Sequence, residues 1–296
     1  MPALRLAPCV ETALALLLFT AAAAAAGEED SIARGEYLVR AGGCISCHTA
    51  SGGQKLAGGR ALRTPFGTFY TPNITPDPAT GIGRWNHAQF LRALRQGIRP
   101  DGTNYFPVFP YTSFTGITDS DVLAIKAYLF SLPAVHKENR PHDVVFPFSW
   151  RLLQTGWKLL FFTRGPFHPK PGRSAIYNRG AYLVTALAHC GECHTPRNSL
   201  GATRSGQRLA GTRDGPDGQR VPNITPDPVT GIGQWDKNDV VEVLRTGTTP
   251  EQGRVKGAMR EVVDDGLKYL SEDDLRAIAD YLSAQPAIVH EVAPKK

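Results

Sequence analysis

A five-residue pattern that occurs twice constrains the fold of this 296-residue chain more than any other feature. The first copy, Cys-Ile-Ser-Cys-His, ends at His48, and the second, Cys-Gly-Glu-Cys-His, ends at His194. This spacing is the signature of covalent haem attachment, in which two thiols add to the vinyl groups of a haem. The histidine that follows becomes the proximal iron ligand. The pattern predicts two haem c groups, attached through Cys44, Cys47, Cys190 and Cys193, with His48 and His194 as axial ligands.

Structural zinc is the main alternative use of such paired cysteines. A zinc site needs four ligands, but the chain has five cysteines and four of them already belong to the two motifs. The fifth, Cys9, lies in a segment that we expect to be removed. The mature protein is therefore expected to contain neither a disulfide nor a free thiol.

Residues 1–26 have the features of a secretory signal. Arg5 gives a basic start, an apolar run follows from Ala13, and the string of alanines offers a cleavage site after Ala26. The leucine-rich part is short for a membrane span of about 20 residues. Because haem c is attached outside the cytoplasmic membrane in bacteria, a signal agrees with the motifs and predicts a periplasmic protein.

The two motifs lie in halves of the chain that repeat each other. Pro-Asn-Ile-Thr-Pro-Asp-Pro occurs at residues 72–78 and again at 222–228, and Thr-Gly-Ile-Gly and a tryptophan follow each copy. Asn73 and Asn223 are expected to hold these loops through side-chain hydrogen bonds. The tryptophans, Trp85 and Trp235, either pack in the core or donate an N–H to a haem propionate. The two copies are separated by the length of a whole domain, which indicates a duplicated domain rather than a solenoid of short repeats.

Apolar residues at helical spacing predict several short helices in each half. One helix leads into each haem motif, and another follows each tryptophan and ends at Gly97 or Gly247. Thr118 and Ser271 are followed by acidic residues and open the last helix of their halves. The predicted fold is all-α, a loop-rich tandem pair of cytochrome c-type domains, each wrapped on a covalent haem. The expected parts are a signal peptide (1–26), domain 1 (27–133), an interdomain linker (134–173) and domain 2 (174–296).

These features together resemble the multihaem cytochrome c subunits of periplasmic dehydrogenases for alcohols, aldehydes and gluconate. The resemblance rests on both haem motifs, both Pro-Asn-Ile-Thr-Pro-Asp-Pro stretches, Phe146-Pro147-Phe148, residues 179–184 and Thr195-Pro196-Arg197-Asn198. It implies an electron-transfer subunit with no catalytic residues of its own. Its partners would be a dehydrogenase catalytic subunit and an electron acceptor, which is quinone, a cytochrome or a terminal oxidase.

The resemblance also implies a methionine on the second axial position of each haem. Beyond Met1 the chain has only Met259, which stands where the family places this ligand, so His194 and Met259 are expected to bind haem two. In the first half Phe109 stands where the family has methionine, and phenylalanine cannot ligate iron. Haem one is then five-coordinate or takes another ligand. The candidates are His87, His136, His142, His168, Tyr105 and Tyr111, whereas His189 is expected to pack near the haem of its own domain.

The linker contains an apolar segment from Phe146 to Phe162 that is interrupted by Arg151 and Lys158. It is short for a membrane span and carries charge. It either packs across the two domains and covers haem edges, which we favour, or makes a peripheral contact with a membrane or a partner subunit.

The remaining composition narrows the function classes. The formal net charge is +6, but no basic cluster is interleaved with aromatic residues, so we expect no nucleic-acid partner. No Ser/His/Asp set, phosphate loop or carboxylate pair indicates a separate active site. We therefore expect an electron carrier rather than an enzyme. The alternative is a haem enzyme or sensor, similar to a peroxidase, that uses an open face of haem one.

Overall fold

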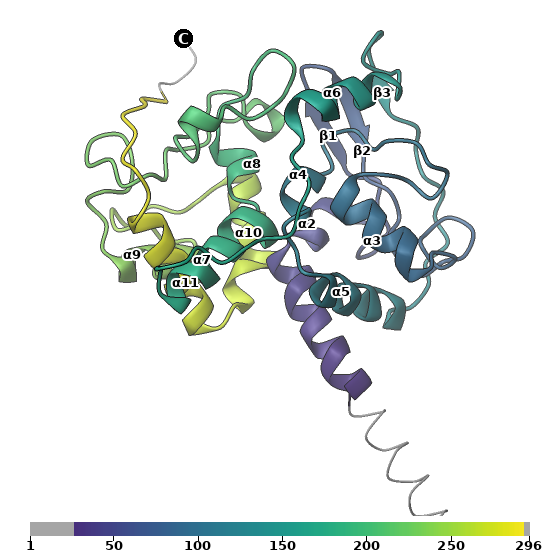
Figure 1. The fold of residues 1–296 in the computed structure, drawn as a ribbon, viewed down its shortest axis with the longest axis horizontal. Coiled ribbons are helices and arrows are strands. Elements are labelled where there is room, and N and C mark those ends of the chain that lie inside the picture. Colours follow the sequence, from purple (N-terminus) through teal and green to yellow (C-terminus); the bar gives the residue numbers. More distant parts are fainter. Residues whose placement is uncertain (1–26, 293–296) are drawn as a thin grey trace, which may run out of the picture.

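Short helices joined by long loops make up most of the chain (Figure 1). The structure is a computed structural model that describes residues 27–292. The signal segment predicted for residues 1–26 lies outside the described residues. The two halves of the chain form two lobes that meet near the first haem motif, and the linker crosses between them (Figure 1).

The first half begins with a helix over residues 27–41, followed directly by the first motif. The prediction of a helix after Trp85 is confirmed, although it begins two residues later, where Asn86 and Gln89 form a reciprocal capping box. Gly97 ends this helix with φ 59°, a left-handed conformation that glycine adopts without strain. The helices of this half after residue 41 are α2 (Cys44–His48), α3 (His87–Gln96), α4 (Tyr111–Phe114) and α5 (Asp119–Ser131).

The second half repeats these elements. The helix α7 (Ala175–Tyr182) continues as the π-helical η1 (Leu183–Leu187) into the second motif, which forms α8 (Gly191–His194). The helix α9 (Lys237–Thr246) starts at a capping box on Asp236 and ends at Gly247, with φ 75°. The remaining elements are η2 (Ser205–Gln207), η3 (Pro216–Gly218), α10 (Gly257–Asp265), η4 (Leu267–Tyr269) and α11 (Glu272–Ser283).

A small antiparallel sheet departs from the all-α prediction. The strands β1 (Ala61–Thr64) and β2 (Gly67–Tyr70) form a hairpin, and β3 (Asp143–Val144) from the linker pairs with β2. Gly67, with φ 123°, lies so close to the Asp143 carbonyl that a Cβ there would be 2.2 Å from its oxygen. The fold is therefore helix-dominated, with one three-stranded sheet in its first lobe.

The linker contributes the helix α6 (Leu153–Phe161), and only one side of it packs as we predicted. On that side Trp157 Nε1 donates to the Leu200 carbonyl at 2.9 Å, and Lys158 Nζ donates to the Gln96 carbonyl at 2.7 Å. Lys158 thus satisfies a free carbonyl at the end of α3. The opposite side is exposed, with Leu159 84% exposed, so the packing interpretation holds for half of the segment.

Two reciprocal hydrogen bonds fasten the lobes together. Asp274 of α11 accepts from Arg179 of its own lobe and from the Tyr37 hydroxyl of the other lobe, at 2.6 Å. In the mirrored arrangement Asp121 of α5 accepts from Arg34 and from Tyr182. Each lobe therefore places a tyrosine on the buried carboxylate of the other. One continuous hydrophobic core runs beneath them and includes Leu38, Val122, Leu183 and Leu275.

Candidate haem-binding sites

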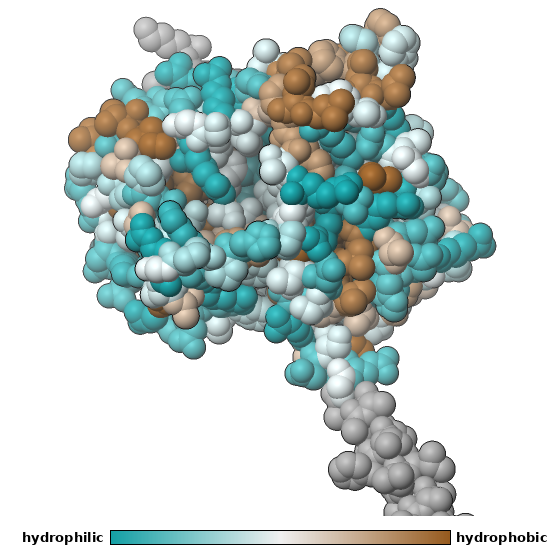
Figure 2. Space-filling model, in the orientation of Figure 1, coloured by the Kyte–Doolittle hydropathy of each residue, from teal (hydrophilic) through white to brown (hydrophobic). Residues whose placement is uncertain are grey.

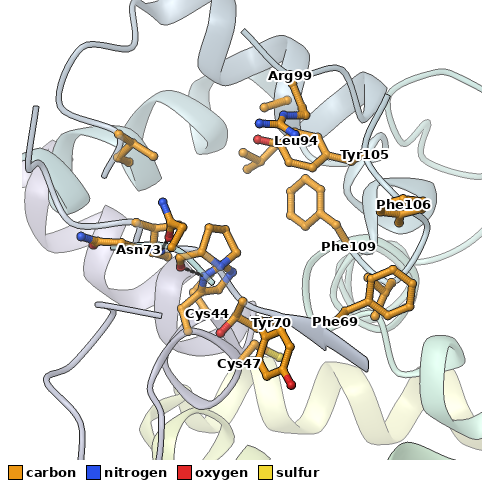
Figure 3. Close-up of a pocket in the computed structure, with 18 of the residues that line it drawn as sticks. Cys44, Cys47, Phe69, Tyr70, Asn73, Leu94, Arg99, Tyr105, Phe106 and Phe109 are labelled. Carbon is orange, nitrogen blue, oxygen red and sulfur yellow. Dashed lines mark hydrogen bonds between the residues drawn. The ribbon is translucent and has the colours of Figure 1, made fainter. Parts of the chain in front are cut away.

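The first motif opens onto a cavity of about 750 Å³ in the first lobe. Cys44, Cys47 and His48 lie on one side, and aromatic and aliphatic side chains that include Phe69, Phe106 and Phe109 form much of the rest (Figure 3). A large apolar cavity with a few convergent polar groups is the usual form of a cofactor site. The position of both thiols and the imidazole at one wall agrees with the predicted attachment.

The two motif histidines are held in the same way. His48 Nδ1 lies 2.8 Å from the Pro72 carbonyl oxygen, and His194 Nδ1 lies 2.8 Å from that of Pro222. Because a carbonyl oxygen only accepts, each Nδ1 carries the proton and each Nε2 keeps its lone pair. Burial lowers the pKa of both imidazoles, which keeps them neutral. Such a bond fixes the tautomer and orientation of metal-binding histidines, so both residues fit axial ligation.

The cysteines lie in surroundings that suit neutral thiols. Burial raises the pKa of Cys44 and of Cys190 to about 12, so neither is a thiolate at neutral pH. A zinc site would need converging ligands. Within residues 27–292, no group of three or more His, Cys, Asp or Glu side chains is arranged to hold a metal ion.

The predicted role of the two asparagines is confirmed. Asn73 Oδ1 accepts from the Thr75 backbone N–H at 2.9 Å, while Nδ2 donates to Thr80 Oγ1 at 3.0 Å. Asn223 makes the same bonds to Thr225 and Thr230 at the same distances. These networks hold the loops whose prolines fix His48 and His194. Trp85 and Trp235 both pack, partly buried, against the core, which was one of the two predicted roles. Trp235 Nε1 also donates to Glu251 Oε1 at 3.3 Å, and Trp85 also lines the first cavity.

Phe109 and Met259 occupy equivalent places in the two lobes. The bridge between Ile98 and Asn104 has its counterpart in the one between Thr248 and Arg254, which fixes the register of the two segments. Phe109 projects into the first cavity, across from Cys44 and Cys47 (Figure 3). Met259 is partly buried against the core and lies on α10.

Of the free histidines proposed for haem one, His142 alone lines the first cavity. Its Nδ1 accepts from the Tyr70 backbone N–H at 3.2 Å. Burial, Arg151 and Arg99 lower its pKa to about 4, so the ring is neutral. His87, His136 and His168 are exposed. The tyrosine candidates divide in the same way, because Tyr105 lines the cavity and Tyr111 is fully buried outside its lining.

The structure gives His189 a contact with the first lobe that the sequence did not predict. His189 precedes Cys190 of the second motif but lines the cavity of the first, where its ring makes an edge-to-face contact with Phe114 at a centroid distance of 5.1 Å. Its φ of 41° is left-handed, and the equivalent residue of the first lobe is Gly43, with φ 64°. A non-glycine residue in this conformation marks a constrained position. The only sign of this constrained position in the sequence is that a histidine stands where the first half has a glycine.

The second motif also contacts the first lobe directly. Glu192 Oε1 accepts from the hydroxyls of Thr112 and Ser113 on α4, both at 2.8 Å. Burial raises the pKa of Cys193 to about 11, with Arg197 opposing and Cys47 adding to the effect. A Cβ built on Gly43, just before the first motif, would lie 3.8 Å from the ring of His189, just before the second, so the two attachment motifs lie close together at the interface.

The first motif makes the corresponding contact with the second lobe. Arg60 donates to the Ser46 carbonyl at 2.8 Å and pairs with Glu261 of α10. Met259 lies on α10, and its counterpart Phe109 lies just before α4, so the two helices hold corresponding places in their lobes. Each attachment motif is therefore tied to the other lobe, the second directly through Glu192 and the first through Arg60.

Comparisons with known proteins agree with this geometry. The family model described as Cytochrome c matches residues 32–133. A protein named "Diheme cytochrome c-type" from Cereibacter sphaeroides is 44% identical over 89% of this chain and 88% of its own length.

Two further relatives are parts of dehydrogenases. A component of the nicotinate dehydrogenase of Pseudomonas putida is 46% identical over 85% of this chain, and "Fructose dehydrogenase cytochrome subunit" of Gluconobacter japonicus is 42% identical over 89%. The chain spans 21% and 54% of the length of these two relatives.

Proposed function

The chain belongs to the family of c-type cytochromes that includes dihaem cytochromes and the cytochrome subunits of dehydrogenases, and from this premise we propose its function. It carries two covalent haem c groups and passes electrons from a dehydrogenase catalytic subunit towards quinone, a cytochrome or a terminal oxidase. It works in the periplasm after removal of residues 1–26. The observation that most strongly supports this proposal is the matched pair of neutral imidazoles, His48 and His194. A proline carbonyl fixes Nδ1 of each ring, which leaves Nε2 for the iron.

Each haem, when bound, would supply the one-electron chemistry of its iron. Cys44 and Cys47 would hold the first, and Cys190 and Cys193 the second. The proline carbonyls orient the histidines, and the aromatic wall of the first cavity keeps water from that site. Met259 would complete haem two, and a thioether ligand raises the reduction potential.

Haem content tests the cofactor part of the proposal. Two haems per chain are expected after alkaline pyridine treatment of the purified protein. The variant Cys190→Ala with Cys193→Ala should retain one haem, and Cys44→Ala with Cys47→Ala should also retain one. A protein with no covalent haem would refute the proposal, and loss of both haems from one pair would refute two independent attachments.

Reduction by substrate tests the electron-transfer part. The tagged chain would be purified from its own cells with whatever dehydrogenase accompanies it, and offered alcohols, aldehydes, gluconate, nicotinate and fructose in turn. Haem reduction with one substrate identifies the partner's class. If an attached dehydrogenase turns over its substrate while both haems stay oxidised, the proposal is wrong. The names of the relatives do not favour the alternative of a peroxidase-like enzyme.

The exposed side of the linker supports a peripheral membrane contact. Phe146, Trp150, Leu152, Leu159 and Leu160 are exposed, and apolar side chains gather over α6 at the upper edge of the molecule (Figure 2). No Asp or Glu occurs between Asp143 and Glu192, a stretch that contains several Lys and Arg residues. Lys158 is turned inward, whereas Arg164, Lys170 and Arg173 of this stretch are exposed. Apolar side chains together with exposed cations suit an anionic lipid surface. No helix among residues 27–292 is long and apolar enough to span a membrane.

Vesicle sedimentation tests this contact. We expect the protein to sediment with phosphatidylglycerol vesicles and less with phosphatidylcholine vesicles. Each buried leucine contributes about 1.5–3 kcal/mol. Leu159→Asp with Leu160→Asp should therefore weaken binding at least about tenfold. Val289→Asp, an exposed apolar residue outside the linker, is the matched control. Equal sedimentation of wild type and the leucine variant would show that the surface serves a protein partner instead.

A further inference from the structure

The two lobes differ at one pair of equivalent positions, and in the first lobe this position lines the cavity. Met259 offers a thioether sulfur in the second lobe, whereas the equivalent residue of the first lobe, Phe109, offers no iron ligand. Phe109 is held there by edge-to-face contacts with Tyr105 and Phe114, at centroid distances of 5.2 and 5.8 Å. The replacement is therefore a packed part of the site rather than a loose side chain.

His142 lies in the cavity but does not present a lone pair to it. The Tyr70 backbone N–H donates to His142 Nδ1, so in the neutral ring the proton resides on Nε2. Its Nε2 is then a hydrogen-bond donor and cannot coordinate iron. The ring is fixed in this orientation by edge contacts with Phe69 and Phe106, at 5.4 and 5.7 Å.

Tyr105 and His189 also line the cavity, but neither is suited to coordinate iron from the wall that contains Phe109. Burial raises the pKa of Tyr105 to about 12, so it remains a phenol, and phenolate is the form that binds iron. His189 has a free Nε2, because its Nδ1 donates to the Leu187 carbonyl at 3.0 Å. Its ring lies against Gly43, beside Cys44, on the side of the attachment motif rather than with Phe109.

We propose that the first haem site keeps the axial position opposite His48 open for a small uncharged diatomic ligand, of the class of carbon monoxide or nitric oxide, whereas Met259 closes the second. The proposal rests on the proposed attachment of haem at both motifs. It concerns binding, and it assigns no reaction to the site. Phe109, Phe106, Val108 and Leu94 all line the cavity, which Arg99 and Arg151 also border, and the apolar part of this wall suits a small uncharged molecule.

Carbon monoxide titration of the full chain, reduced under anaerobic conditions, is the direct test. We expect one carbon monoxide per two haems, seen as a change in half of the haem absorbance. Phe109→Met should abolish binding and add the charge-transfer band of a methionine-ligated ferric haem. The mirrored Met259→Phe variant should double the binding to two carbon monoxide molecules per chain. Phe109→Leu, which supplies no ligand, is the matched control and should bind one, as wild type does.

The same samples separate the possible failures. Haem content, measured first, reports on the proposed attachment and is independent of carbon monoxide. A wild-type protein that holds two haems, is fully low-spin and binds no carbon monoxide would overturn the open site. Gain of binding on His142→Phe or His189→Ala would then identify the side chain that occupies it. Because the wild-type titration is decisive by itself, the test does not depend on the folding of any variant.

Discussion

Removal of one hydroxyl at the lobe interface should weaken the whole fold. Tyr37 donates to Asp274 Oδ2 at 2.6 Å, and the Asp274 side chain is 10% exposed and also binds Arg179. A hydrogen bond to a charged group contributes about 1.5–3 kcal/mol. Since Arg179 still satisfies the carboxylate in Tyr37→Phe, we expect a loss of about 2 kcal/mol. For a chain of this size that corresponds to a fall in Tm of about 4 °C.

Tyr182→Phe removes the mirrored bond to Asp121 and should cost a similar amount. The two bonds share no partner, so the double variant should lose about the sum, or about 4 kcal/mol. The assay is denaturant unfolding followed by far-ultraviolet circular dichroism, with haem content matched between samples. Tyr177→Phe is the control, because the described residues provide no hydrogen bond to its hydroxyl.

A refuting outcome is a Tyr37→Phe protein that unfolds at the same denaturant concentration as Tyr177→Phe. That result would mean that the lobes are held by their shared apolar core and that the tyrosines only report the arrangement. The prediction matters for function because these bonds set how the two attachment motifs face each other. Electron transfer between the lobes should slow in any variant that loosens them.

Three further predictions concern single sites. Burial raises the pKa of Asp274, but bonds from Arg179 and Tyr37 outweigh it and hold the pKa below its usual value. Its stabilisation should therefore be full above the unfolded pKa of about 4 and be lost as pH falls through the lower folded value. An unfolding series in acid should show this loss, with a flatter profile for Asp274→Asn. Gly97→Ala should destabilise more than Gly102→Ala, because both have positive φ but only at Gly97 would the Cβ meet an aromatic ring, at 2.4 Å; comparing the two denaturant midpoints checks this. Met259→Ala should make haem two high-spin or re-ligated with a lower potential, and an unchanged spectrum and potential would remove Met259 from the ligand set.

Local patterns in the sequence predicted several elements around the site correctly. A helix follows each tryptophan, and Gly97 and Gly247 end these helices, although the caps at Asn86 and Asp236 were not foreseen. Asn73 hydrogen-bonds within its own loop, as its place in the repeated stretch indicated. These features depend on residues only a few positions apart, so the sequence of one short segment is enough to predict them.

Some features arise from contacts between distant segments, and the sequence did not reveal them. The strand β3 pairs with β2 across more than 70 residues, so local propensity gave no sign of the sheet. His189 enters the first cavity only because the lobes face each other with their motifs together. The linker leaves Leu159 exposed because Trp157 and Lys158 turn the other side of α6 inward.

The sequence by itself determined the chemistry of attachment, because two thiols and an imidazole at fixed spacing within one turn define what they can bind. It also identified Phe109 as the odd residue of the pair. Only the tertiary structure decided that His142 is not the missing ligand. The backbone N–H of Tyr70, 72 residues away, donates to His142 Nδ1 and so places the ring proton on Nε2. Whether a side chain is a ligand or a donor depends on such a distant bond, and composition and spacing carry no record of it.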